Sequence, residues 1–125
     1  MQVFEIPLET PSKKNSRVTC RRTGRSFPNK RYNSWHSQAM AIVKAQSTLK
    51  QPISSPVYIR GYFVRGDRRR RDNNNSGASI LDMLVDAGVL ADDNDEIVVC
   101  EKWKKLGVEK GAPMCKVIIE GYNNE

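Results

Sequence analysis

The segment at residues 56–64, PVYIRGYFV, constrains the fold of this chain most strongly. Val57, Ile59 and Phe63 occupy alternate positions, so in an extended chain their side chains point to one face. β-branched and aromatic residues such as these are typical of strands. The segment therefore predicts a β-strand with one face in the core.

Two segments with helical spacing flank this strand. Residues 31–50 repeat apolar side chains at intervals of three and four, and residues 77–88 do so over a shorter length. The apolar stripes consist of Trp35, Ala39, Ile42, Val43 and Leu49 in the first segment and Ile80, Leu84 and Ala87 in the second. Gln51-Pro52 predicts the end of the first helix, and Ser76 and Gly88 are the expected caps of the second.

Three further strands are predicted at residues 2–8, 96–103 and 114–122. Residues 11–30 are rich in basic and turn-forming residues, which indicates a loop or a loose hairpin. The order strand, loop, helix, strand, helix, strand, strand is typical of an α/β or α+β fold with a mixed sheet. The 125 residues fit one such domain, spanning residues 1–125.

The composition excludes several classes of protein. Cys20, Cys100 and Cys115 are far apart and His36 is the only histidine, so a Cys–His zinc site or a secreted disulfide framework has no plausible residue set. The N-terminus lacks the pattern of a signal peptide, and no stretch approaches the roughly 20 apolar residues of a membrane helix. We therefore expect a cytoplasmic protein with no membrane partner.

The charges divide between the two halves of the chain. Residues 1–72 hold 16 Lys/Arg and 4 Asp/Glu, a balance of +12, whereas residues 73–125 hold 5 Lys/Arg and 10 Asp/Glu, a balance of −5. A basic half suits a polyanion such as DNA, because binding of its phosphates releases counterions. Acidic residues would repel DNA, so some of them are best explained as ligands of a cation.

The basic residues that we expect to hold DNA phosphates form two clusters. They are Lys13, Lys14 and Arg17 in the N-terminal loop, and Arg68, Arg69, Arg70 and Arg71 after the central strand. No recognition helix with base-reading side chains is apparent. The shape of the DNA should therefore matter more than its base sequence.

Carboxylates are the candidates for catalysis. The chain contains no Ser-His-Asp set, phosphate-binding loop or dinucleotide fingerprint, and no small-molecule cofactor is expected. Asp72, Asp82, Asp92 and Asp93 could converge at one end of the sheet if each strand returns beside the previous one. Two or three of these carboxylates would suffice to bind Mg²⁺. The same spacing also fits capping and turn formation, above all at residues 92–95.

These residues resemble a known family. The run Gly66-Asp67-Arg68-Arg69-Arg70-Arg71-Asp72, followed by Asp82-Met83-Leu84, Ala87-Gly88-Val89 and Asp92-Asp93, is similar to the core of the RusA-type Holliday-junction resolvases. Residues 11–17, PSKKNSR, resemble that family's early proline–serine–asparagine stretch, and residues 116–119, KVII, fit its last strand. The resemblance covers nearly the whole chain and is strongest at residues 65–97.

The resemblance implies a RusA-like fold and a homodimer that binds four-way DNA junctions and makes paired nicks in DNA recombination and repair. The implied cofactor is Mg²⁺, with Mn²⁺ as a substitute. Asp72 matches the first carboxylate of the family's D-x-D-N-x-x-K stretch, and Asp93, with Asp92 beside it, matches the late essential one.

Two positions depart from that pattern. Asn74 stands where the family usually has its second aspartate, and Ala78 stands at the lysine. Asparagine offers a cation a neutral oxygen without a charge. Either Asp82 compensates from the helix, or the site is weakened or inactive. Three hypotheses follow: a Mg²⁺-dependent nuclease, a junction-binding protein without catalysis, and, with less support, an RNA-binding protein.

Overall fold

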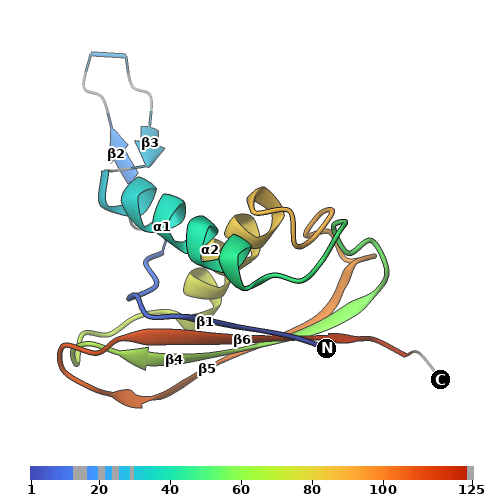
Figure 1. The fold of residues 1–125 in the computed structure, drawn as a ribbon. Coiled ribbons are helices and arrows are strands. Elements are labelled where there is room, and N and C mark those ends of the chain that lie inside the picture. Colours follow the sequence, from blue (N-terminus) through green and yellow to red (C-terminus); the bar gives the residue numbers. More distant parts are fainter. Residues whose placement is uncertain (13–16, 20–21, 24–25, 29, 124–125) are drawn as a thin grey trace.

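Four strands form one mixed sheet, and two helices cover one of its faces (Figure 1). The computed structural model describes residues 1–12, 17–19, 22–23, 26–28 and 30–123. The elements in chain order are β1 (Gln2–Ile6), β2 (Arg17–Thr19), β3 (Ser26–Pro28), α1 (Lys30–Gln46), β4 (Val57–Arg65), α2 (Asn73–Asp86), β5 (Val98–Val108) and β6 (Met114–Gly121). The predicted mixed sheet with two helices is confirmed.

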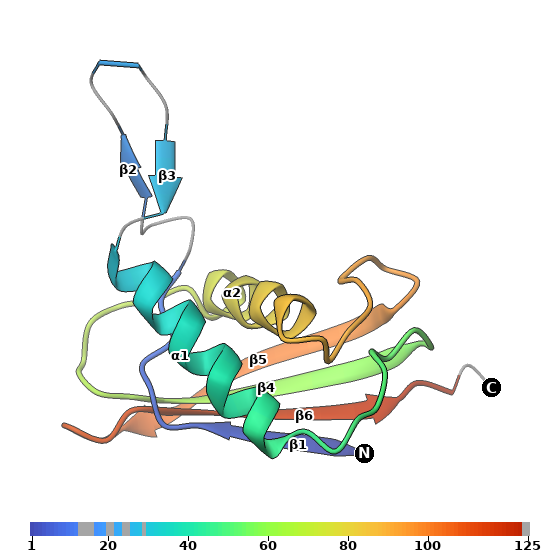
Figure 2. The same ribbon diagram turned by 45° about the horizontal axis from the view of Figure 1, so that its top comes forward.

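The sheet has the strand order β1-β6-β4-β5. β4 and β5 are parallel neighbours joined through α2, whereas β6 pairs antiparallel with both β4 and β1. A parallel pair needs a crossover connection, which α2 supplies. Because of this crossover, the arginine-rich segment after β4 lies at one end of the sheet. The segment before β5 lies at the other end (Figure 2).

The core lies between the sheet and the two helices. Ile59 and Phe63 of β4 are fully buried, and alternate residues of this strand are only partly buried, as the alternation predicted. Tyr58 and Tyr62 lie on the uncovered face, where they are half-buried. Among the described residues, no helix is long and apolar enough to cross a membrane.

The end of α1 and the start of α2 differ from the prediction. α1 ends at Gln46, before the Gln51-Pro52 signal, although Leu49 still packs against the core. α2 begins at Asn73, four residues before the predicted start, because Asp72 and not Ser76 is its N-cap. At its other end Gly88 has a positive φ of 78°, one residue after the C-cap Ala87, so glycine follows the helix as expected.

A tryptophan explains the glycine inside α2. The ring of Trp103 is buried between β4 and α2, and a Cβ added at Gly77 would lie 2.3 Å from it. A Cβ added at Gly61 of β4 would lie 2.0 Å from the same ring. The two glycines therefore make room for Trp103, which also stacks on Phe63 at a centroid distance of 5.9 Å.

A short antiparallel hairpin precedes α1. β2 pairs with β3 between Arg17 and Pro28, and Figure 2 shows the hairpin extending beyond the N-terminal end of α1. The prediction left open whether residues 11–30 form a loop or a loose hairpin, and the structure has a hairpin. Lys13 and Lys14 lie outside the described residues. Only the backbone of Arg17 is described.

Candidate nucleic-acid interface

The arginine loop, residues 66–72, connects β4 to α2 and starts from a buried cation. Arg65, the last residue of β4, is 1% exposed. Its guanidinium donates to the Thr10 carbonyl oxygen at 3.1 Å and to Asn73 Oδ1 and Ser76 Oγ at 3.1 Å each. It also lies over the ring of Phe63, 4.3 Å from the centroid. Arg65 thus joins the β1–β2 connection to the first turn of α2.

Glu9 fixes the start of the arginine loop. Its Oε2 pairs with Arg65 Nη1 at 3.0 Å, and its Oε1 accepts a hydrogen bond from the Gly66 backbone N–H at 3.0 Å. The same Oε1 lies 3.2 Å from Arg71 Nη2. Since one carboxylate contacts both ends of the loop, it holds them close together. Sequence reasoning missed Glu9 and Arg65, because neither lies in a motif.

Arg71 is used within the loop. It pairs with Asp67 through Nη1–Oδ1 at 2.9 Å and donates from Nη2 to Oδ2 at 3.1 Å. Asp67 Oδ1 also accepts from the Arg69 backbone N–H at 2.9 Å. The hydrogen bonds from Arg71 and the Arg69 backbone lower the pKa of Asp67, which stays ionised. Arg71, expected to bind DNA, therefore organises the loop.

The side chains of Arg68, Arg69 and Arg70 are not used within the loop as that of Arg71 is. Their side chains are exposed, and within the described part of the chain they make no ion pair or hydrogen bond. Three neighbouring guanidinium groups without carboxylate partners produce a strong positive potential. Such groups bind phosphate well because their planar forks match its oxygens.

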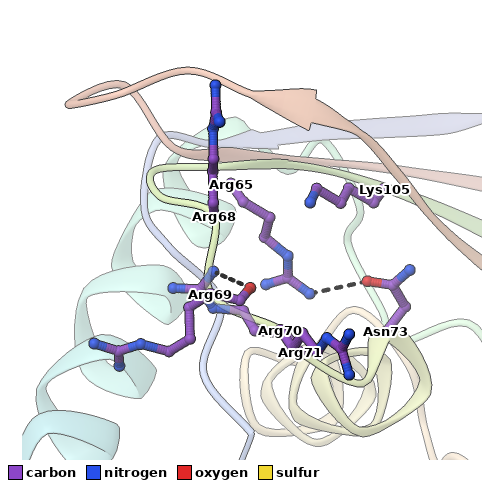
Figure 3. A pocket seen from close by; sticks show the side chains of 7 residues that line it. All are labelled: Arg65, Arg68, Arg69, Arg70, Arg71, Asn73 and Lys105. Atoms are coloured by element: carbon purple, nitrogen blue, oxygen red, sulfur yellow. Dashed lines mark hydrogen bonds between the residues drawn. The ribbon is translucent and has the colours of Figure 1, made fainter.

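The arginine loop borders two cavities. Cavity 1 has a volume of about 280 Å³ and is lined by Arg65, Arg68, Arg69, Arg70, Arg71, Asn73 and Lys105 (Figure 3). Cavity 2 has a volume of about 720 Å³ and extends to the start of α1 and the β5–β6 turn. Its lining includes Arg31, Trp35, Asp72, Gly111 and Pro113 as well as Arg69, Arg70 and Arg71. Both cavities therefore share the arginine loop as part of their lining.

Asp72 is the last residue of the arginine loop, and it caps the N-terminus of α2. Its Oδ1 accepts hydrogen bonds from the backbone N–H groups of Asn74 at 2.9 Å and Asn75 at 3.1 Å. These groups belong to the first turn of the helix, which has no partner for them within the helix. The carboxylate is exposed and also lines cavity 2. Asp72 therefore has a structural role that its place in the sequence motif did not reveal.

Asp82, Asp92 and Asp93 gather near the other end of α2. Asp92 Oδ1 accepts from the Asp93 backbone N–H at 2.8 Å, and the Asn94 side chain donates to Asp92 Oδ2 at 3.1 Å. Partial burial, then a hydrogen bond with Asp92 and the charges of Asp92 and Asp82, raise the pKa of Asp93. The charges of Asp92 and Asp82 thus act on Asp93, although burial is the larger cause of its raised pKa.

The four candidate carboxylates therefore do not converge within one chain. Asp72 precedes α2 and Asp82 lies ten residues further along it, which corresponds to about 15 Å along the axis at about 1.5 Å per residue. The four carboxylates were expected to converge because the loops before and after α2 were expected at the same end of the sheet. A crossover helix instead carries the chain from one end to the other, so the two loops lie at opposite ends (Figure 2).

Two aspartates of α2 contact side chains of α1. His36 Nε2 lies 2.8 Å from Asp86 Oδ2, and Tyr32 donates from its hydroxyl to Asp82 Oδ2 at 3.4 Å. Burial, and next the charge of Asp82, raise the pKa of Tyr32 above its ordinary value. His36, Asp82 and Asp86 place one ligating atom each within 4.8 Å of one another. The spacing of Asp82 and Asp86 by one turn was the available signal, whereas His36 lies in no sequence motif.

No model of a known protein family matches the chain, and no curated protein matches it.

Proposed function

We propose that the protein binds branched DNA through the arginine loop and cuts it with the help of Mg²⁺, as a resolvase of the RusA type. The observation that carries the DNA-binding part is the set of three exposed arginines, unpaired among the described residues, on a loop that Glu9, Arg65 and Asp67 hold in place. The similarity of residues 65–97 to the RusA motif supports the proposed cleavage of branched DNA and its dependence on Mg²⁺.

The organisation of the loop favours binding to a phosphate backbone. A mobile basic segment would lose conformational entropy on binding, whereas this loop is already fixed at both ends by Glu9. Backbone contacts of this kind bring affinity and position the DNA without reading its sequence. Selectivity would therefore come from the shape of the DNA.

The carboxylates near the end of α2 fit Mg²⁺. Asp82, Asp92 and Asp93 offer hard oxygen ligands, which Mg²⁺ and Mn²⁺ prefer. Partial burial is the main cause of the raised pKa of Asp93, and the charges of Asp92 and Asp82 add to it; a divalent cation would offset those charges. A bound cation would supply charge stabilisation for a phosphodiester under attack. His36 and Asp86 adjoin this group, but imidazole suits transition metals better than Mg²⁺.

A homodimer would bring the arginine loop of one chain close to the carboxylates of the other. The arginines and Asp72 lie at one end of α2, and Asp92 and Asp93 lie beyond the other. In a two-fold pair, the acidic end of one chain can meet the basic end of its partner, and the contact forms twice. This arrangement would place a carboxylate cluster beside bound phosphates at two positions, as paired nicking requires.

The experiment uses a labelled four-way junction and a linear duplex with the same arm sequence, each incubated with the protein in Mg²⁺ or in EDTA. Paired nicks on the junction alone, lost in EDTA, support the proposal. To test the dimer, Asp72→Asn and Asp93→Asn proteins are mixed after subunit exchange. Cleavage by the mixture but not by either variant alone would show that the two aspartates come from different chains.

A binding protein without catalysis is the second candidate. Asn74 and Ala78 replace two charged positions of the resembled motif, and a single chain leaves Asp72 apart from Asp92 and Asp93. Tight junction binding with no cleavage in Mg²⁺ or Mn²⁺ would favour this function.

A further inference from the structure

The arginine loop borders two cavities, and different cationic residues complete the lining of each. Arg69 and Arg70 line both cavities. Arg68 and Lys105 belong to cavity 1 alone, whereas Arg31 belongs to cavity 2 alone. Each cavity therefore combines shared guanidinium groups with at least one cation of its own.

The sheet register directs Lys105 toward cavity 1. Lys105 pairs with the fully buried Phe63 of β4, so its side chain leaves the sheet on the face that the helices cover. Lys104 pairs with Tyr62 and points to the opposite face. Figure 3 shows Lys105 extending toward Arg65 across cavity 1. Two neighbouring lysines thus differ in whether they can contact an anion at the loop.

The exposed arginines of the loop do not all point the same way. In Figure 3 the side chains of Arg68 and Arg69 extend in different directions from the arginine loop, with Arg69 directed toward α1. Among the residues that the structure describes, no carboxylate lines cavity 1. Cavity 2 includes three carboxylates: Glu9 and Asp67 pair with Arg71, and Asp72 accepts hydrogen bonds as the N-cap of α2. Arg31, Arg69 and Arg70 still outnumber Asp72 there and can attract an anion.

We propose that the arginine loop lies between two arms of a branched DNA and holds the phosphate backbone of one arm in each cavity. This inference rests on the proposed DNA-binding function and deepens it. A branch point offers backbones of two arms at once, so both cavities are filled. A backbone from a linear duplex fills one cavity and leaves the other to solvent. The loop would therefore be the feature that selects branched DNA.

The test measures binding by fluorescence anisotropy for a four-way junction and a linear duplex, without divalent metal, over a series of salt concentrations. Arg68→Ala/Lys105→Ala removes the two exposed cations specific to cavity 1, where the buried Arg65 stays paired with Glu9. Arg31→Ala removes the cation specific to cavity 2. Lys104→Ala and Lys44→Ala are the matched controls, because each removes one exposed charge outside both cavities.

Wild-type protein is expected to bind the junction more tightly than the duplex. Each cavity variant should lose that preference while it keeps its affinity for the duplex, which can still use the intact cavity. On the junction, the slope of log K against log salt should fall by about 2 for Arg68→Ala/Lys105→Ala and by about 1 for Arg31→Ala. The control variants should behave like wild type on both DNAs.

Equal weakening on duplex and junction would overturn the inference, because it would mean that the loop enters a groove of one duplex and contacts both of its backbones. A junction preference that survives in both cavity variants would overturn it as well. Wild-type protein that binds both DNAs equally refutes the two-arm arrangement but keeps DNA binding. Wild-type protein that binds neither DNA refutes the proposed function itself.

Discussion

Replacing Arg65 by alanine should cause a large loss of stability, although the residue lies next to the surface loop. Arg65 is 1% exposed, pairs with Glu9 and donates three further hydrogen bonds. Removing one partner of a buried ion pair costs about 3–5 kcal/mol. Glu9 keeps 28% of its side-chain surface in solvent, which lowers the cost, but the buried hydroxyl of Ser76 loses a donor, which raises it. We expect about 4 kcal/mol in total.

Urea denaturation followed by tryptophan fluorescence measures this loss. With a slope of about 2 kcal/mol per molar urea, the midpoint should fall by about 2 M. Arg65→Lys keeps the charge without the planar fork and should give an intermediate loss. Arg68→Ala is the matched control, because this exposed arginine should change the stability by at most about 0.5 kcal/mol. A loss below about 1 kcal/mol for Arg65→Ala would refute the idea that Arg65 anchors the loop.

Asp93→Asn should abolish cleavage and leave junction binding intact or tighter; a nicking assay showing the wild-type rate would contradict the proposed metal group. The folded-state pKa of Asp93 is raised, so its ionised form disfavours the fold, and Asp93→Asn should be more stable than wild type at neutral pH. In thermal melts that difference should vanish as the pH falls below the unfolded value of about 3.9, and a constant difference would argue against this cause. Asp72→Ala should cost about 1 kcal/mol in urea denaturation and Asp72→Asn much less, because asparagine also caps helices well; equal losses would exclude the cap. Gly77→Ala should cost about 1–3 kcal/mol, because its Cβ would overlap the ring of Trp103, and an unchanged urea midpoint would refute that packing.

The sequence predicted those parts of the fold that depend on periodicity. The alternation at residues 56–64 matches the burial pattern of β4, and the apolar stripe beginning at Trp35 matches the buried face of α1. The start of α2 was predicted four residues too late, because residues 73–76 were assigned to the loop after the strand. Their helical conformation depends on a cap from Asp72 and on the fit of Gly77 against Trp103, a residue that is distant in sequence.

The candidate site was less predictable, because it too depends on contacts between residues that are distant in sequence. Four arginines in a row look equivalent in a sequence, yet Arg71 pairs with Asp67 and Glu9 while Arg68 to Arg70 stay exposed. That distinction depends on Glu9, which lies 62 positions before Arg71 in the printed sequence. The separation of Asp72 from Asp93 likewise depends on the direction of α2, which spacing alone does not reveal.

The most direct test of the central claim is the salt dependence of DNA binding by Arg69→Ala/Arg70→Ala compared with wild type. These two arginines line both cavities, so the account predicts weaker binding to a four-way junction and to a linear duplex alike. The slope of log K against log salt should fall by about 2, since each lost phosphate contact contributes about 0.9. An unchanged slope and affinity would contradict the account, because the arginine loop would then not contact DNA.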